Sequence, residues 1–278
     1  MLNFQKMLID AFTTELETAF IRTYGDLKRD FSSFFAWAGR LALENICNSD
    51  LLYHNVDHTM LVALAGQEIL IGKHLSEGGV SPGDWTHVLL ALLCHDIGYV
   101  RGVCQNDGNG KYATGVGSEV VELPAGGADA ALAPYHVDRS KLFIRERFGG
   151  RLMIDLDPDR VESYIEMTRF PPPDDAFYKD TTGYGGLVRA ADFIGQLGDP
   201  NYLRKIPALF YEFEEIGLNE KSGYKNPQDM RQNYAKFYWD VVSPYIQPAL
   251  KYLRITQEGK QWIANLYANV FSVEHNQG

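Results

Sequence analysis

The chain has 278 residues, of which 45% are hydrophobic and 22% are charged, and its formal net charge is -10 at pH 7. This composition excludes an intrinsically disordered chain, and the length is sufficient to bury a sizeable core. The acidic balance argues against charge-driven binding to a nucleic-acid backbone or to an anionic membrane surface.

The three cysteines show no CxxC spacing, so we expect neither a disulfide framework nor a structural zinc site, and a reducing cytoplasm fits best. Residues 1–6 lack a continuous apolar segment, and no long apolar run occurs elsewhere. The sequence therefore predicts neither a signal peptide nor a transmembrane helix.

Apolar residues recur at helical spacing along most of the chain. Gly25 is placed to end the first helix, and Ser81 followed by Pro82 is typical of a helix start. Strand signals are nearly absent, and no internal repeat is found. The expected helices are 4–23, 34–43, 50–69, 82–95, 130–148, 158–168, 187–197, 200–213, 227–242 and 257–271.

Residues 101–129 differ from the rest because they are rich in glycine and lack helical periodicity. They predict a loop with a short hairpin around Val120, Val121 and Leu123. Such a segment is either a lid or specificity loop, or an ordinary surface insertion. The whole pattern predicts a single all-α domain over residues 1–278. Its core spans about 50–200, preceded by N-terminal helices and followed by a C-terminal helical extension.

An apolar run at residues 89–94 ends in His95 and Asp96, at the edge of the expected core. A buried carboxylate without a partner is costly, so Asp96 requires a cation or several hydrogen-bond donors. His58 lies upstream, and Asp192 follows a second apolar segment. Each residue alone has a structural interpretation, such as a packed histidine or a hydrogen-bonded carboxylate. Together they predict that all four meet around a divalent metal.

Local signals place these side chains on helices. Either Ser49 or Asp50 is expected to cap the helix that carries His54 and His58, whose spacing of four would put both rings on one face. Gly98 indicates that the helix before it ends near His95-Asp96, which lets the two adjacent side chains converge.

The ordered pattern of His58, His95-Asp96 and Asp192 resembles the HD-domain superfamily of metal-dependent phosphohydrolases. Residues 95–98 read His-Asp-Ile-Gly, as in the HDIG signature of that superfamily. Residues 53–58 are similar to the YHNxxH motif of class I cyclic-nucleotide phosphodiesterases, which share the fold. The resemblance spans residues 53–197 and implies a multi-helix bundle of the HD or phosphodiesterase type.

The resemblance also implies roles for individual residues. His58, His95, Asp96 and Asp192 would hold a first metal, and Asp96 would bridge to a second. His54 would donate a proton to the leaving oxygen. These roles agree with general chemistry, because a metal acidifies a bound water and an imidazole has a suitable pKa for proton donation.

His136 is the only histidine between Asp96 and Asp192, whereas HD-fold proteins with a full second-metal shell use two there. We expect a loosely held second metal with Asp96, His136 and waters as ligands. The alternative is that His136 contacts substrate or caps a helix.

Several side chains are candidates for binding an anionic substrate. Arg101, Arg139, Lys141 and Arg189 are near the motifs in the sequence, and Gln196 lies one turn beyond Asp192. The alternative for the cations is a solvated surface, and for Gln196 a polar contact at the helix end.

The sequence thus predicts hydrolysis of a small phosphoester, by a phosphodiesterase or a nucleotide phosphohydrolase that uses a metal-activated water. An HD-fold di-iron oxygenase and a non-catalytic nucleotide-binding sensor are the alternatives. The ligand set suits iron, manganese, zinc, nickel or cobalt, with magnesium at the looser position. The sequence gives no signal for an oligomeric state.

Overall fold

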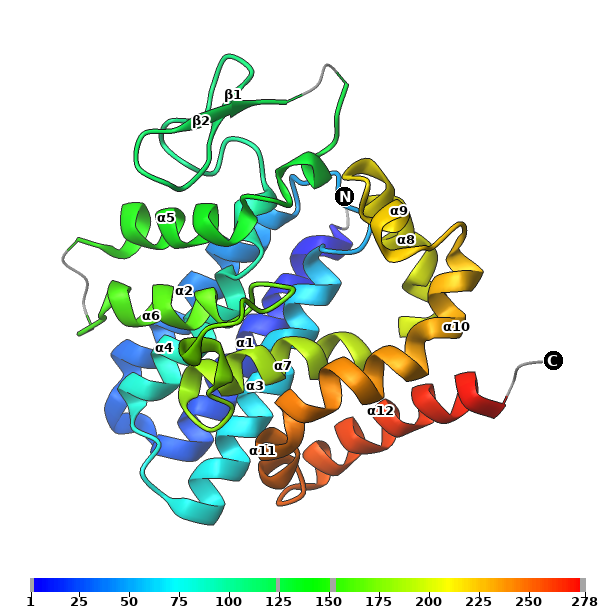
Figure 1. Cartoon of the computed structure of the whole chain (residues 1–278). Helices are drawn as coiled ribbons and strands as arrows, with labels where there is room; N and C mark the ends of the chain where they lie inside the picture. The colour runs from blue at the N-terminus through cyan, green and yellow to red at the C-terminus, as the bar shows by residue number, and fades with distance from the viewer. Residues whose placement is uncertain (1–2, 124–125, 151–153, 276–278) are drawn as a thin grey trace.

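A computed structural model describes residues 3–123, 126–150 and 154–275, and within these ranges the chain is a bundle of α-helices (Figure 1). The all-α class expected from the sequence is therefore confirmed. The α-helices are α1 (Phe4–Tyr24), α2 (Arg29–Ile46), α3 (Val56–Glu77), α4 (Pro82–Cys94), α5 (His136–Phe148), α6 (Pro158–Glu166), α7 (Tyr184–Leu197), α8 (Tyr202–Glu215), α9 (Leu218–Ser222), α10 (Pro227–Phe237), α11 (Ser243–Leu253) and α12 (Gln257–His275).

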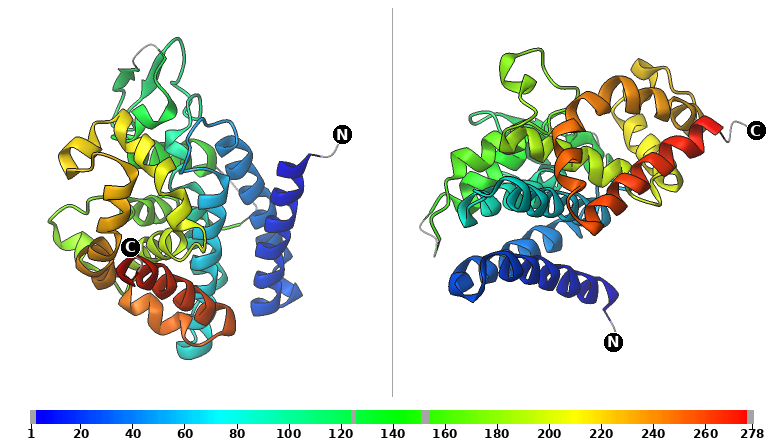
Figure 2. Two further views of the ribbon diagram at one scale, coloured as in Figure 1. Left: turned by 90° about the vertical axis from the view of Figure 1, so that its right-hand side faces the viewer. Right: turned by 90° about the horizontal axis from the view of Figure 1, so that it is seen from below.

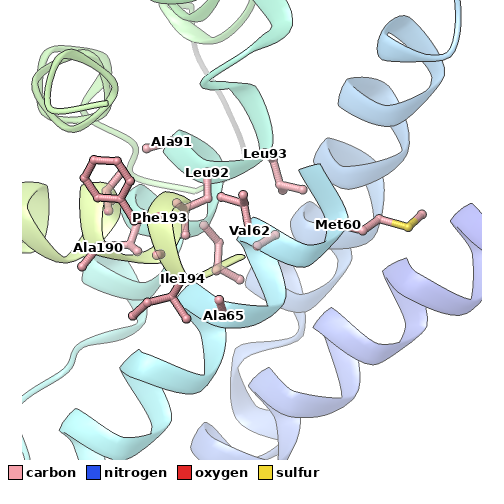
Figure 3. Packing of buried hydrophobic residues seen from close by; sticks show 14 of the residues in the cluster. Met60, Val62, Ala65, Ala91, Leu92, Leu93, Ala190, Phe193 and Ile194 are labelled. Carbon is pink, nitrogen blue, oxygen red and sulfur yellow. The ribbon is translucent and has the colours of Figure 1, made fainter. Parts of the chain in front are cut away.

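The centre of the bundle is formed by α3, α4 and α7, whose apolar side chains interdigitate (Figure 3). Val62 of α3, Leu92 of α4 and Ile194 of α7 are fully buried at this junction. Burying each such side chain contributes about 1.5 to 3 kcal/mol, so the junction is a rigid base for whatever these helices carry. All four predicted metal ligands lie on or directly after these three helices.

The N-terminal helices α1 and α2 lie side by side along one side of the molecule, and the C-terminal helices lie on the other (Figure 2). The Asn3 side chain caps α1, and Gly25, at φ 74°, ends it as the sequence predicts. Phe20 of α1 contacts Trp85 of α4 edge-to-face, with ring centroids 6.2 Å apart. Aromatic packing of this kind fixes the pair against the central helices.

The glycine-rich segment after α4 contains the expected hairpin. Strands β1 (Lys111–Ala113) and β2 (Val120–Glu122) pair antiparallel, with Tyr112 opposite Val121. The fully buried Arg139 of α5 bonds to both oxygens of Asp107 in this segment, at 3.0 and 2.9 Å, and to the Ala113 carbonyl. The described part of the segment is thus held against α5. Residues 124–125, within the predicted loop, lie outside the described residues.

The C-terminal region departs from the expected helix 227–242. Helix α10 ends at Phe237, and a π-helical turn at Tyr238–Val242 leads into α11, which the sequence analysis did not anticipate. Helix α11 contains two prolines, of which Pro244 stands in the first turn, where proline is tolerated, and Pro248 lies inside the helix. The Asn269 side chain of α12 donates to the Leu197 carbonyl at 2.9 Å, which attaches α12 to the end of α7.

Several predicted helix starts are wrong, for local reasons. Asn55, rather than Ser49 or Asp50, caps α3, because its side chain accepts from the backbone of Asp57 and His58. The expected helix 130–148 is divided into a 3-10 turn at Asp129–Leu132 and α5. Two further starts move by a few residues, to Tyr184 for α7 and Tyr202 for α8.

No helix in residues 3–123, 126–150 and 154–275 is long and apolar enough to cross a membrane. The segment 1–6, considered above for a signal peptide, includes Met1 and Leu2, which lie outside the described residues. The organisation of residues 1–278 as a single domain stays a prediction.

Candidate metal centre

The four residues predicted to bind metal converge on one point. Nε2 of His58 lies 3.3 Å from Nε2 of His95, 3.2 Å from Oδ2 of Asp96 and 3.5 Å from Oδ1 of Asp192. Nε2 of His95 lies 3.1 and 3.6 Å from the same two carboxylate oxygens. Each of these imidazole nitrogens therefore lies within 3.6 Å of one oxygen from each carboxylate, and the donor atoms of His58, His95 and Asp192 all lie within 4.8 Å of one another.

Close packing of α3 on α7 sets this convergence. His58 is in the first turn of α3, and Asp192 is in the middle of α7. One turn beyond them, Gly195 faces the backbone of Val62, and a Cβ on Gly195 would lie 2.5 Å from Cα of Val62. Only glycine permits this approach without displacement, so Gly195 lets the His58 and Asp192 side chains reach each other.

His95 and Asp96 enter the site because α4 ends beside them, as the sequence predicts. Helix α4 ends at Cys94, and a 3-10 turn follows at Ile97–Tyr99. Nδ1 of His95 lies 2.8 Å from the carbonyl oxygen of Leu92, which accepts a hydrogen bond from Nδ1–H. Nε2 is then the nitrogen whose lone pair can bind a metal ion. That is the tautomer a metal ligand requires.

Asp96 is buried, and its Oδ2 has no hydrogen-bond partner within the described residues. Burial raises the pKa of Asp96, but the neighbouring histidines lower it well below its usual range, so the group is a carboxylate. Burial likewise lowers the pKa of His95, whereas Asp96 and Asp192 raise it well above its usual range. The site therefore attracts positive charge, as a proton or as a cation that replaces it.

His136 approaches Asp96 from the other side. Its Nε2 lies 3.8 Å from Oδ1 of Asp96, while its Nδ1 lies 2.6 Å from the Ala133 carbonyl. Gly98 makes this approach possible, because a Cβ on Gly98 would overlap the His136 carbonyl. The backbone N–H of Gly98 also donates to Oγ of Ser140 on α5, at 2.9 Å. The two oxygens of Asp96 thus face different nitrogen donors.

His54 lies next to the four ligands but is not on the helix with His58, contrary to the sequence analysis. The Asn55 cap puts His54 in the turn before α3, yet the His54 and His58 rings are 5.3 Å apart. Nδ1 of His54 lies 2.6 Å from Oε2 of Glu212 on α8. Burial lowers the pKa of His54, but Glu212 raises it to about 9, which keeps the ring protonated near neutral pH.

The sequence analysis missed Glu212. Its Oε1 also accepts from the backbone N–H groups of Tyr53 and His54, so one carboxylate orients the whole turn. A signal was present, because Glu212 lies three residues after the buried Leu209 and therefore on the same face of its helix. An acid at such a position is buried and requires a partner.

A family model matches nearly the whole chain. The model of the Npun_R2479-like family matches residues 2–276. The chain belongs to the Npun_R2479-like family. A search of curated proteins gives no match. The family description states no reaction, metal or substrate, so the chemistry of this Npun_R2479-like chain is argued from its residues.

The donor geometry of this Npun_R2479-like chain fits a divalent cation. Ligand bonds to zinc or similar ions are about 2.0 to 2.3 Å long, so neighbouring donors of one ion lie about 3.0 to 3.6 Å apart. The five distances given above, from 3.1 to 3.6 Å, agree with this separation. Oδ2 of Asp96 is a further sign, because it is buried, accepts no hydrogen bond within the described residues and faces the two histidine nitrogens.

The side chains predicted to bind an anion already have partners within the protein. Arg101 pairs with Asp50 at 2.6 Å and also with Asp129. Lys141 pairs with Asp138 at 2.7 Å and with Glu166.

The remaining three predicted residues have partners too. Arg139 is enclosed with Asp107, as described above, and is not accessible to a ligand. Arg189 is buried and donates to the carbonyls of Tyr178 and Asp180. The amide nitrogen of Gln196 lies 3.3 Å from the Tyr202 hydroxyl, which is the helix-end contact foreseen as its alternative.

Exposure shows from which side the centre is reached. The side chains of His58 and His95 are 3% and 2% exposed, whereas those of Asp192, His136 and His54 are 20%, 19% and 15% exposed. A ligand would therefore approach from the side lined by Asp192, His136 and His54. Two cavities of about 260 and 310 Å³ lie elsewhere and contain none of these side chains in their linings.

Proposed function

We propose that this chain is a metal-dependent hydrolase of the HD type that cleaves a small phosphodiester. The proposal rests on one observation above all. Nitrogen and oxygen donors from three helices meet around a buried carboxylate oxygen that has no other partner. The resemblance of residues 53–197 to the HD superfamily supports the same chemistry.

His58, His95, Asp96 and Asp192 would hold the first cation, and Oδ1 of Asp96 with His136 would hold a second more loosely. A bound divalent cation supplies an acidified water as nucleophile and neutralises charge on the phosphate oxygens. The burial of His58 and His95 excludes solvent from one side of the centre, which strengthens both effects.

His54 would act as the proton donor. When water oxygen bonds to phosphorus and the ester P–O bond breaks, the leaving oxygen takes up the proton, giving an alcohol and a phosphomonoester. A protonated imidazole paired with a carboxylate is suited to this step, because Glu212 holds Nδ1 and leaves Nε2–H to face the substrate. Nε2 of His54 would then take up a new proton from solvent, because the ring is partly exposed.

The distribution of cationic side chains favours a substrate of low charge. Arg101, Arg139 and Lys141 are all neutralised by carboxylates of the protein. A nucleoside triphosphate or other polyphosphate needs several free cations for recognition, whereas a phosphodiester carries one negative charge, which a metal centre neutralises. We therefore propose a phosphodiester, including a cyclic or linear nucleotide ester, as the substrate class.

The test is hydrolysis of two diesters by metal-free protein to which Mn²⁺, Zn²⁺ or Fe²⁺ is added. Bis(p-nitrophenyl) phosphate has a good leaving group, and 3′,5′-cyclic AMP has an alkoxide that needs a proton. His54→Asn should slow cyclic AMP hydrolysis about 100-fold or more, and the aryl ester much less. Glu212→Gln should give the same pattern with a smaller loss.

Equal losses on the two esters would contradict the proton-donor role. Oxygen consumption with Fe²⁺ and no phosphate product would instead indicate the di-iron oxygenase. Nucleotide binding without turnover under any metal would indicate the sensor. The three free cysteines, Cys47, Cys94 and Cys104, support the further proposal of a reducing, cytoplasmic location.

A further inference from the structure

Tyr99 forms a stack of three rings with the two histidines that flank Asp96. Its ring is nearly parallel to that of His136, with centroids 4.3 Å apart and planes 16° apart. It is also nearly parallel to that of His54, at 5.2 Å and 17°. Tyr99 is 7% exposed, and its hydroxyl takes part in no hydrogen bond within residues 3–123, 126–150 and 154–275. The contact that Tyr99 makes at this site is therefore through its ring.

The stack supplies an orientation that hydrogen bonds alone leave free. The ring of His54 has one hydrogen-bond partner, the Glu212 carboxylate, and the ring of His136 has one, the backbone carbonyl of Ala133. A single hydrogen bond at Nδ1 sets the tautomer but allows the ring plane to turn about that bond. A parallel aromatic face removes this rotation, so Nε2 of each ring is fixed in direction.

Tyr99 is itself fixed relative to Asp96. It ends the 3-10 turn that follows Asp96, and its backbone N–H donates to the Asp96 carbonyl at 3.1 Å. Leu51 and Ala130 pack against it in a small apolar cluster. The ring therefore carries the position of the Asp96 turn to both histidines.

A second contact joins the same three segments. Arg101, two residues after Tyr99, pairs with Asp50 and Asp129. Asp50 precedes His54 and accepts from the backbone N–H of Asp129 at 2.7 Å, and Asp129 precedes His136. These ion pairs hold the segments together at their outer ends, while the stack sets the angle of the rings within.

We propose that Tyr99 is a positioning residue that orients His54 toward the substrate and His136 toward the second cation, through its ring and not its hydroxyl. This inference rests on the proposed function, because it assigns His54 and His136 their roles there. It adds that one aromatic side chain, absent from the motifs recognised in the sequence, couples proton donation to the second metal position.

The experiment compares Tyr99→Phe, which keeps the ring, with Tyr99→Leu, which keeps apolar volume but removes the stack. Tyr267→Leu on α12, where the tyrosine is exposed, is the control for loss of a ring away from the site. Mn²⁺ binding is followed by electron paramagnetic resonance, and turnover by bis(p-nitrophenyl) phosphate and cyclic AMP. Tyr99→Met replaces Tyr99→Leu if the latter does not fold by circular dichroism.

Tyr99→Phe should bind two Mn²⁺ and turn over as the parent protein does. Tyr99→Leu should keep the first Mn²⁺, bind the second about 10- to 100-fold more weakly, and lose kcat on cyclic AMP with little change in KM. The inference is overturned if Tyr99→Leu binds and turns over like the parent, or if Tyr99→Phe shows the same loss.

A measurement on the metal-free protein separates this inference from the proposed function. In the parent and in Tyr99→Phe, the ring-proton resonances of His54 and His136 should be shifted upfield by the stacked ring, and in Tyr99→Leu the shifts should vanish. If they behave so while the parent binds no Mn²⁺, the proposed function fails and the orienting role stands. If the parent binds Mn²⁺ and hydrolyses diesters but the shifts are absent, only the inference about Tyr99 fails.

Discussion

Two buried charged clusters lie on either side of the turn after α4, and they differ in how their charges are satisfied. In the metal cluster (His58, His95, Asp96 and Asp192), donor atoms face one another, and Oδ2 of Asp96 has no hydrogen-bond partner. In the Arg139 cluster (Arg139 and Asp107), the guanidinium meets both carboxylate oxygens and three backbone carbonyls.

Burial of charge therefore does not by itself mark a functional site. Arg139 and Asp107 are less exposed than any of the metal-cluster side chains, yet together they leave no charge to be compensated. Such a pair holds elements together, and breaking it is costly. The metal cluster, in contrast, is complete only with an added cation, and this is the expected mark of a ligand site.

The largest expected effect is that of Asp96→Asn, which keeps the shape of the side chain and removes its charge. We expect loss of metal binding and a fall in diester hydrolysis of about 1000-fold or more. The metal-free protein should be less stable than the parent, because the neighbouring histidines lose the carboxylate that pairs with them. Metal content by atomic emission, hydrolysis rates and urea unfolding measure the three quantities. A variant that still turns over at the parental rate would exclude the metal cluster as the active centre.

Asp107→Asn should destabilise the fold without removing the metal. Removing one partner of a buried pair leaves Arg139 uncompensated, so we expect a loss of about 3 to 5 kcal/mol in the free energy of unfolding. Urea unfolding of the metal-free protein measures it. Metal stoichiometry of the folded fraction should stay parental. If Asp107→Asn is as stable as the parent, the contrast between the two clusters is wrong.

Added metal should stabilise the parent by mass action. At a free metal concentration 100 times the Kd, the gain is about 2.7 kcal/mol, and it appears as a rise in Tm by differential scanning calorimetry. The rise should be absent in Asp96→Asn and present in Asp107→Asn at the same metal concentration. A rise of equal size in Asp96→Asn would mean that the ion binds elsewhere.

Gly195→Ala tests whether helix approach sets the metal cluster. The added Cβ would lie 2.5 Å from Cα of Val62, so α7 must move away from α3. We expect a loss of about 1 to 3 kcal/mol in stability and weaker metal binding, measured by unfolding and by Mn²⁺ titration. Gly108→Ala is a suitable comparison, since a Cβ on Gly108 would meet no atom within 4 Å and Gly108 lies in the segment before β1. Equal metal affinity in the two variants would contradict this account.

The smallest effect concerns Glu166, a carboxylate that is less buried than those of Asp96 and Asp107. Burial raises its pKa, but Arg169, Lys141 and Tyr178 lower it to about 2. Because the folded-state pKa is below the unfolded one, this stabilisation is present above about pH 4.5 and is lost as pH falls toward 2. Glu166→Gln should remove about 1 to 2 kcal/mol at pH 7 and flatten the acid limb of stability against pH.

Chemical denaturation between pH 2 and 7 gives the curve for Glu166→Gln. Asp159→Asn is the matched control, because Asp159 pairs with Arg145 but is 78% exposed. It should change stability by less than about 0.5 kcal/mol. An unchanged acid limb in Glu166→Gln would remove Glu166 from the ion pairs that support the fold.

The helical class and several helix ends could be predicted from the sequence, because these features depend on residues a few positions apart. Ser81 caps the helix that it was expected to cap, with its side chain bonded to the first turn. The identity of the metal-ligand candidates also came from short motifs. The proximity of His95 and Asp96 followed from the helix end beside them.

Which groups distant in the sequence come into contact depends on how the helices pack, and this could not be predicted from local patterns. Glu212 is 158 residues from His54, and no local spacing indicates their hydrogen bond. The same holds for Arg139, which the sequence analysis put forward for an anion and which Asp107 encloses instead. Local patterns fix backbone hydrogen bonds within a helix, whereas pairing between elements depends on how close the helices pack, as Gly195 against Val62 illustrates.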